Sequence, residues 1–113
     1  MHEMSLAEGM VTAVQEQALA QNFRHVKRVV LEIGTLSHVD PHAMEFSFCA
    51  ATKGTLMDGA TLEILSPPGQ AHCFSCDQDV KIERRGDGCP NCGSHQLIVT
   101  GGEEMKLKSL EVV

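Results

Sequence analysis

Four of the five cysteines in this chain form two Cys-x-x-Cys pairs with twelve residues between them. Each pair can fold as a tight loop that places two thiolates about 3.5–4 Å apart, which is the edge of a tetrahedron built on metal–sulfur bonds of about 2.3 Å. Four thiolates fill the coordination shell and leave no position for a reactive water, which indicates a structural metal ion. The spacing therefore predicts a tetrathiolate zinc site whose ligands are Cys73, Cys76, Cys89 and Cys92.

Two other interpretations of these cysteines remain open. Two disulfides are disfavoured because the expected cytosolic compartment is reducing, and a rubredoxin-type iron site is disfavoured because the rest of the chain does not build a small all-β fold. His72 and His95 flank the pairs and either could replace a thiolate, although surface histidines are the simpler interpretation. Cys49 lies far from the cluster in sequence, and we expect it to be a buried, inert thiol.

Met1, His2 and Glu3 form a second group that could bind a metal ion. The α-amino nitrogen, the backbone amide of His2 and its imidazole can chelate one ion, and Glu3 can add a backbone nitrogen or a carboxylate oxygen. Nitrogen-rich, nearly planar arrangements of this kind suit Ni(II) or Cu(II). The alternative is a frayed terminus whose acidic residue complements a helix dipole. Asp40 and His42 could face this terminus, but a capping role explains Asp40 without a metal.

The first helix that must position these groups is predicted at residues 5–21. Ser5 and Glu8 form a capping box, so we expect the helix to begin at Ser5 and to leave Met1 to Met4 outside it. Apolar residues recur at helical spacing along this segment. The expected apolar stripe comprises Leu6, Met10, Val11, Ala13, Val14 and Ala18.

The other elements alternate between strands and one further helix. A β-branched run predicts a strand at residues 24–33, which Gly34 ends and in which Val29, Leu31 and Ile33 share one face. A second helix is expected to begin with Pro41 after an Asp40 cap and to end before Gly54. Two more strands are predicted at residues 61–65 and 105–112.

Residues 70–101 are expected to form a separate cysteine-containing unit, inserted between two strands. The Ser-Pro-Pro-Gly run at residues 66–69 interrupts any strand ladder, and the glycine pair at residues 101–102 closes the insert. The insert has too little apolar material for a core of its own, so we expect a metal to hold it together. The predicted fold class is α+β, in the order helix, strand, helix, strand, insert, strand.

Length and charge exclude several functions. The chain has 113 residues, 42% hydrophobic residues and a formal charge of −6, which disfavours a nucleic-acid surface and binding to anionic membranes. We expect no transmembrane segment and no signal peptide, and hence a cytoplasmic location. The sequence contains no nucleophile–base pair, phosphate loop or open metal site, so we do not expect an enzyme. A zinc-ribbon interaction or nucleic-acid-binding module is the alternative function, and the net charge counts against it.

The chain resembles the HypA/HybF family of hydrogenase-maturation nickel metallochaperones from end to end. The resemblance rests on Met1-His2-Glu3 with Ser5-Leu6, the Val30–Gly34 run with Leu36-Ser37, the two cysteine pairs with Cys89-Pro90, and Ser109–Val112. It implies two helices and a three-stranded mixed sheet, formed by residues 1–69 and 102–113, joined to an inserted zinc-ribbon-like lobe at residues 70–101.

The resemblance also implies site residues and partners. His2 carries over as the essential nickel ligand, assisted by the Met1 amine and by Glu3, while the four paired cysteines carry over as zinc ligands. The family works with an accessory GTPase, HypB, and delivers nickel to the large subunit of [NiFe]-hydrogenase. Some relatives serve urease, and both monomers and homodimers occur. We expect the first helix and the nearby terminus to contact the GTPase, because nickel has to pass there.

Overall fold

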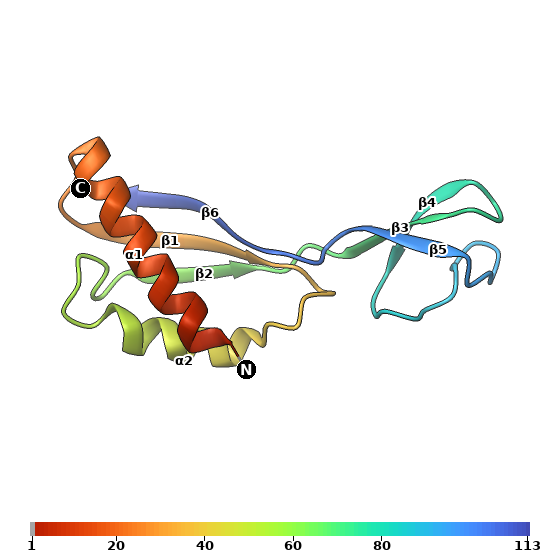
Figure 1. Cartoon of the computed structure of the whole chain (residues 1–113), viewed down its shortest axis with the longest axis horizontal. Coiled ribbons are helices and arrows are strands. Elements are labelled where there is room, and N and C mark those ends of the chain that lie inside the picture. The colour runs from red at the N-terminus through yellow and green to blue at the C-terminus, as the bar shows by residue number, and fades with distance from the viewer. Residues whose placement is uncertain (1) are drawn as a thin grey trace. The chain divides into compact units, whose positions relative to one another are not determined.

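The computed structural model describes residues 2–113, and its elements follow the predicted order (Figure 1). A helix, a strand, a helix and a strand come first, three short strands follow in the cysteine-containing part, and a long strand ends the chain. None of the helices in this described part is long and apolar enough to cross a lipid bilayer. The elements are α1 (Glu3–Gln21), β1 (Val26–Ile33), α2 (Pro41–Thr52), β2 (Thr61–Leu65), β3 (Gly69–Cys73), β4 (Gln78–Ile82), β5 (Leu97–Gly101) and β6 (Met105–Val112).

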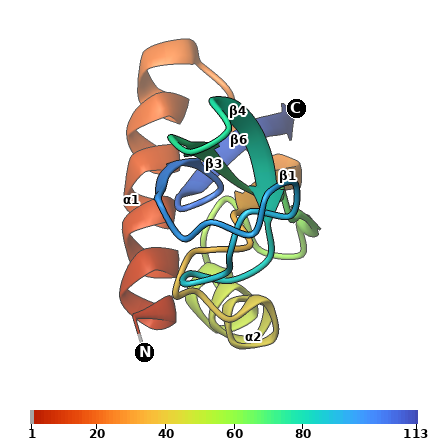
Figure 2. The same ribbon diagram turned by 90° about the vertical axis from the view of Figure 1, so that its right-hand side faces the viewer.

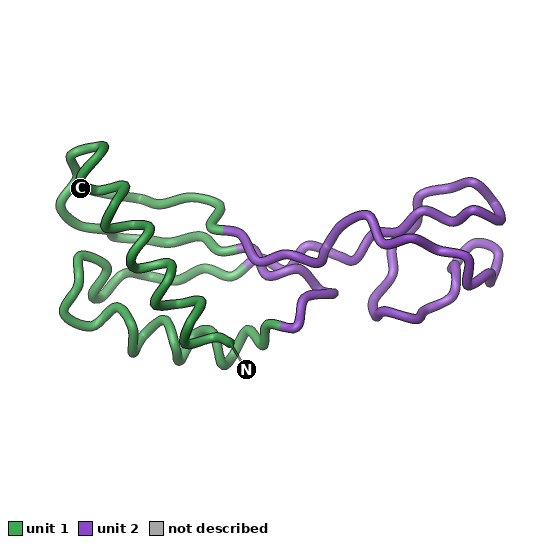
Figure 3. Tube along the Cα trace, in the orientation of Figure 1, with its two compact units in different colours: residues 1–31, 39–64, 107–113 green, residues 32–38, 65–106 purple. Residues whose placement is uncertain are grey.

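The first of two compact units comprises residues 1–31, 39–64 and 107–113 (Figure 3). Its sheet has the strand order β2-β1-β6, and β6 runs opposite to the other two strands, so the three-stranded mixed sheet is confirmed (Figure 1). Helix α1 crosses the strands obliquely (Figure 1), and α2 lies beside the N-terminal turns of α1 (Figure 2). Val29, Leu31 and Ile33 of the central strand are buried, as predicted.

Helix α1 begins two residues before the predicted start, and the predicted capping box of Ser5 and Glu8 is wrong. The helix starts at Glu3, and His2 occupies the cap position without a side-chain hydrogen bond. The reason is a tertiary contact: the carboxylate of Glu3 is buried and accepts a hydrogen bond of 3.1 Å from the backbone N–H of Asp40. This contact holds the first turn in place without help from a serine cap.

The buried face of α1 follows the predicted stripe at Met10, Val11 and Val14, while Leu6 and Ala18 are only half-buried. Ala13, which we expected on the stripe, is exposed, whereas Ala7 is buried. Both differences follow from helix geometry, because the buried stripe is centred on residues spaced three and four apart and Ala13 falls beside it. The buried apolar residues of α1 are Ala7, Met10, Val11 and Val14.

The start of α2 is as predicted. One carboxylate oxygen of Asp40 accepts hydrogen bonds from the backbone N–H groups of His42, at 2.9 Å, and Ala43, at 3.5 Å. Pro41 takes the first helical position, where its missing N–H is not needed. Gly54 has a φ of +75°, which places it in the left-handed region just beyond the helix end. The local sequence therefore defined both ends of this helix.

The prediction that Cys49 is buried is wrong. The thiol is exposed on α2, although the adjacent residue Phe48 is buried at 4% exposure. Successive helical residues point about 100° apart, so the neighbour of a core residue can face solvent. Cys49 therefore lies outside the apolar core.

The second compact unit comprises residues 32–38 and 65–106. Its sheet has the strand order β4-β3-β5, and β3 pairs antiparallel with both neighbours. The unit contains a small apolar core, whereas we expected the insert to have too little apolar material for one. The core also uses Leu36, which lies far from the cysteines in sequence. Its buried members are Leu36, Ala71 and Ile82, with Val80, Leu97 and Val99 packed against them.

Glycines allow two segments of this second unit to pass close together. The backbone N–H of Gly34 donates to the carbonyl of Glu104 at 2.9 Å, and that of Leu36 donates to the carbonyl of Gly102 at 2.8 Å. A Cβ atom on Gly34 would overlap the backbone carbonyl of Gly102. A backbone carbonyl cannot rotate away as a side chain can, so residue 34 has no space for a larger residue.

We expect Gly34→Ala to lower the free energy of unfolding by about 2–4 kcal/mol, because the methyl group forces two segments apart. Gly9→Ala is the matched control. A Cβ on Gly9 meets no atom within 4 Å, and Gly9 lies inside α1, so this change should stabilise by about 0.5–1 kcal/mol. Urea unfolding at matched metal content measures both values. Equal stability of the two variants would contradict the close packing at Gly34.

Candidate metal-binding sites

The structure brings the four paired cysteines together. Cys73 ends β3 and Cys76 lies in the turn before β4, while the other two lie in the loop between β4 and β5. The four Sγ atoms all lie within 4.8 Å of one another. Within residues 2–113, this is the one group of His, Cys, Asp or Glu side chains whose ligand atoms converge in this way. The group consists of Cys73, Cys76, Cys89 and Cys92.

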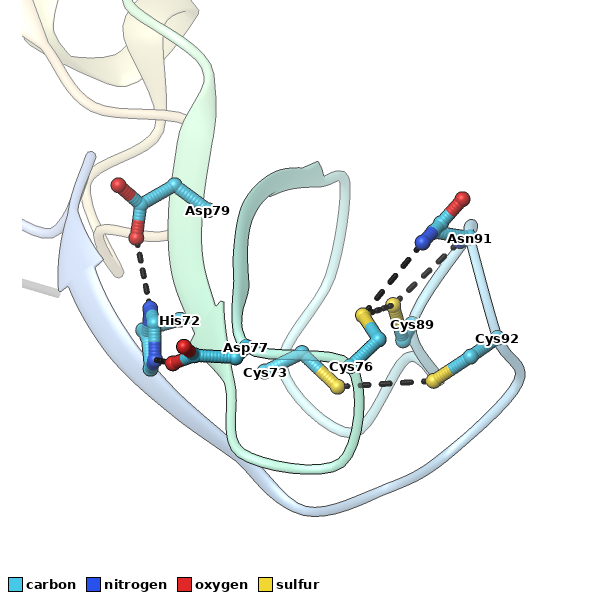
Figure 4. A network of polar contacts seen from close by, with 8 residues as sticks. All are labelled: His72, Cys73, Cys76, Asp77, Asp79, Cys89, Asn91 and Cys92. Atoms are coloured by element: carbon cyan, nitrogen blue, oxygen red, sulfur yellow. Dashed lines mark hydrogen bonds and ion pairs between the residues drawn. The ribbon is translucent and has the colours of Figure 1, made fainter.

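The sulfur spacing fits a tetrahedral metal site. The Sγ atoms of Cys73 and Cys92 are 3.6 Å apart, and those of Cys76 and Cys89 are 3.8 Å apart (Figure 4). Metal–sulfur bonds of about 2.3 Å produce a tetrahedron edge of about 3.8 Å. A disulfide needs about 2.05 Å between its sulfurs, and all five cysteines of the described chain are free. The arrangement can therefore hold a metal ion through four thiolates.

Two residues in the left-handed backbone conformation shape the two cysteine loops. Asp77 follows the first pair with a φ of +55°, and Gly93 follows the second pair with a φ of +80°. These left-handed residues turn the chain sharply after each pair. The backbone N–H of Cys89 donates to the carbonyl of Ser94 at 2.7 Å, and the N–H of Gly93 donates to the carbonyl of Cys89 at 2.8 Å. The second loop is thus closed by two hydrogen bonds.

The surroundings of Cys89 lower the pKa of its thiol, which favours the thiolate form. Burial raises its pKa, but hydrogen bonds from the backbone N–H groups of Cys92 and Asn91 and from the thiols of Cys92 and Cys73 together lower it to about 7. The thiolate is the form that binds metal ions. The four sulfurs differ in exposure: Cys73 and Cys89 are buried, Cys76 is half-buried and Cys92 is exposed.

The two histidines that flank the cysteines are not part of the cluster. His95 is exposed, and His72 points both ring nitrogens at carboxylates (Figure 4). Its Nδ1 lies 2.8 Å from Asp79, and its Nε2 lies 3.1 Å from Asp77. The hydrogen bond to Asp79 is the largest cause that raises the pKa of His72. These contacts explain His72 without a metal.

The candidate nickel residues lie at the start of α1. Met1 falls outside the described residues, so the predicted Met1 ligand is not placed. His2 is exposed at the cap position, and its carbonyl accepts the N–H of Leu6 at 2.9 Å. The N-terminal ammonium group and the backbone N–H of Asp40 lower the pKa of the Glu3 carboxyl to about 2, so Glu3 is ionised at neutral pH.

Sequence reasoning missed the contact between Glu3 and Asp40. It joins the first turn of α1 to the start of α2, and Asp40 takes part through its backbone while its side chain caps α2. Glu3 and Asp40 are 37 positions apart, and no local pattern in the sequence signals the contact. His42 is exposed in the first turn of α2.

The fold and the cysteine cluster define a two-unit protein with a four-thiol metal-binding site, and comparison with known proteins identifies the class. A family described as "Hydrogenase/urease nickel incorporation, metallochaperone, hypA" matches residues 1–112. The chain belongs to this HypA family, whose members are maturation factors and metallochaperones rather than catalysts.

Individual relatives match over nearly their whole length. The chain is 51% identical to hydrogenase maturation factor HypA of Azotobacter vinelandii over 112 residues, which are 99% of each chain. It is 54% identical to hydrogenase maturation factor HypA of Bradyrhizobium sp. (strain ORS 278) over 112 residues, which are 99% of each chain. The solution structure of the Ni metallochaperone HypA from Helicobacter pylori matches with a TM-score of 0.72 at 29% identity, over 100% of this chain and 98% of that one.

Proposed function

We propose that this protein binds Ni(II) at its N-terminus and delivers it, with a HypB-type GTPase, to the large subunit of [NiFe]-hydrogenase. The observation that carries the proposal is the start of α1, where an exposed His2 occupies the helix cap in a chain that belongs to a nickel-incorporation family. A cargo ion must be released as well as bound. A ligand on an exposed helix end can enter a partner's cleft and exchange there.

The helix end also supplies backbone nitrogens for nickel. The cap residue and the first three helical residues have N–H groups that make no hydrogen bond within the helix. His2 is the cap residue and Glu3 is the first helical residue, so neither nitrogen takes part in the i to i−4 hydrogen bonds of the helix. With the imidazole of His2 and the amine of Met1 they make the nitrogen-rich, nearly planar set that Ni(II) favours. These ligands lose protons on binding, so nickel occupancy should fall with acidity.

We assign the backbone nitrogen of Glu3, and not its carboxylate, to nickel, because the carboxylate is buried against Asp40. Glu3→Gln retains an oxygen that can accept from the Asp40 N–H, so we expect nickel affinity within about threefold of the native value. Nickel titration measures the affinity, and the NMR shift of the Asp40 amide proton reports the contact. A loss of affinity above about thirtyfold with an unchanged Asp40 shift would instead make the carboxylate a ligand.

A structural zinc ion is the second part of the proposal. The sulfur distances and the all-thiolate donor set fit zinc, and Cys73, Cys76, Cys89 and Cys92 would hold it in a closed shell. When bound, such an ion supplies folding energy to the loops around it. We propose residues 70–101 as the zinc-binding part and residues 1–69 with 102–113 as the nickel-binding part. A reducing cytoplasm would keep the four thiols available.

The delivery role is tested in cells whose hydrogenase maturation depends on this chain. At low external nickel, we expect the native chain to restore hydrogenase activity and the nickel content of the purified large subunit. His2→Ala should restore less than about a tenth of either, because cargo binding is lost, while excess nickel in the medium should recover part of the activity. Equal restoration by the native and variant chains would contradict nickel delivery through His2.

The GTPase contact is proposed for α1, next to the cargo. Charge reversal at Glu8 and Glu16, both exposed on α1, should weaken association with the GTPase. Charge reversal at Asp79, exposed in the second unit, is the control and should leave the association constant unchanged. The opposite pattern would place the contact on the second unit.

A further inference from the structure

Asn91 contacts both halves of the four-cysteine cluster. It lies in the second loop, where its backbone N–H donates to the Sγ of Cys89 at 3.4 Å. Its side-chain Nδ2 reaches across to the first loop and donates to the Sγ of Cys76 at 3.5 Å (Figure 4). The same amide donates to the Oε1 of Gln78 on β4 at 3.3 Å. One exposed residue therefore links both cysteine loops and a strand.

The orientation of the Asn91 amide follows from the charges around it. A side-chain NH₂ group carries two N–H donors, which suffice for one sulfur and one carbonyl oxygen. The reversed orientation would place the amide oxygen against the sulfur of Cys76, and two acceptors would then repel one another. This repulsion is strongest when Cys76 is a metal-bound thiolate. The NH₂ group therefore has to face the sulfur.

The two hydrogen bonds that Asn91 donates to sulfur fall on one side of the cluster. They reach Cys76 and Cys89, whose sulfurs are 3.8 Å apart, while the pair formed by Cys73 and Cys92 takes no hydrogen bond from this residue. A divalent ion with four thiolates has a net charge of −2, and N–H donors stabilise that charge. They also reduce the electron donation of the sulfurs that accept them.

We propose that Asn91 is a positioning residue of the metal site, which joins the two cysteine loops through the thiolates of Cys76 and Cys89 and slows release of the bound ion. The proposal rests on the metal assignment made above. On this proposal, the bound ion is held more tightly by the thiolates of Cys76 and Cys89 than by those of Cys73 and Cys92. The exposed Cys92 is then the thiolate from which release to a chelator begins.

The test compares three variants loaded with cobalt or zinc. Asn91→Ala removes the side-chain donor but retains the backbone N–H. Asn91→Asp places a carboxylate oxygen at the sulfur of Cys76 and adds like-charge repulsion. Ser75→Ala is the matched control, because Ser75 lies at the equivalent position of the first loop and its hydroxyl contacts Ser94 at 2.7 Å and not a sulfur.

We expect all variants to bind one metal ion per chain, and Asn91→Ala to release zinc to a chelator about tenfold faster than the native chain. Asn91→Asp should be faster still, and Ser75→Ala should stay within about twofold of native. In the cobalt-loaded chains, Asn91→Ala should shift the thiolate-to-cobalt charge-transfer band to lower energy, because its sulfurs donate more strongly. A merely structural role would not move this band.

Two results would overturn the proposal, and they differ from one another. If the charge-transfer band of Asn91→Ala stays at the native energy and its zinc release rate equals that of Ser75→Ala, the role of Asn91 is refuted, while the metal assignment stands. A native cobalt-treated chain without a four-thiolate band refutes the metal assignment, and the role of Asn91 with it.

Discussion

The His2→Ala variant should lose more than about a hundredfold in nickel affinity while its fold and zinc content stay native. His2 is exposed, so its replacement leaves no cavity, and its side chain makes no cap hydrogen bond that the helix would miss. In the proposed site, its imidazole closes the chelate that would hold the amine and the backbone nitrogens in one plane. Removing the imidazole therefore weakens several bonds at once. Calorimetry and ligand-field absorption measure nickel affinity and coordination.

His42→Ala is the control for this first prediction. His42 is also exposed, in the first turn of α2, and no nickel role is assigned to it. We expect its nickel affinity to equal that of the native chain. If His2→Ala binds nickel as the native chain does, the site has to be sought at His42, at the cysteine cluster, or at His38, which is exposed in the segment between β1 and α2.

The Cys73→Ser variant should lose its zinc and the order of the second unit. Cys73 is fully buried at the end of β3, and three thiolates cannot complete the closed shell. Structural zinc sites contribute about 10–16 kcal/mol of binding free energy to folding. The small core around Leu36, Ala71 and Ile82 cannot replace that contribution. We expect zinc content near zero and fast amide exchange across residues 65–106, with the first unit protected.

Cys49→Ser is the control for this second prediction, because Cys49 is an exposed thiol outside the cluster. It should retain one zinc ion per chain and native amide protection. A Cys73→Ser variant that retained both as well would show that the four cysteines do not hold the metal that stabilises this unit.

The features predicted well from the sequence are those that local chemistry determines. Asp40 and Pro41 start α2 because a side chain and a ring next to the helix supply what its first turn needs. The four cysteines converge because two short loops, each with a thiol at both ends, can supply the four corners of one tetrahedron. The alternation of apolar and polar residues in β1 predicted which face of the strand is buried, because successive strand residues point to opposite sides of the sheet.

The features that sequence reasoning missed depend on contacts between distant residues. A serine followed three positions later by glutamate satisfies the capping pattern, yet the helix starts earlier because Glu3 meets the backbone of Asp40. The core of the second unit is completed by Leu36, which lies outside the predicted insert and shares a cluster with Ala71 and Ile82. Composition within residues 70–101 could not reveal an apolar side chain supplied from elsewhere.

The most direct test of N-terminal nickel binding is a nickel titration of the zinc-loaded native chain beside the same chain with its α-amine acetylated. Acetylation turns the amine into an amide that cannot coordinate as a free amine, and it leaves every side chain unchanged. The account predicts about one nickel ion bound per native chain, a loss of affinity of more than about a hundredfold on acetylation, and unchanged zinc content in both. Equal nickel affinity and absorption spectra in the two samples would contradict it.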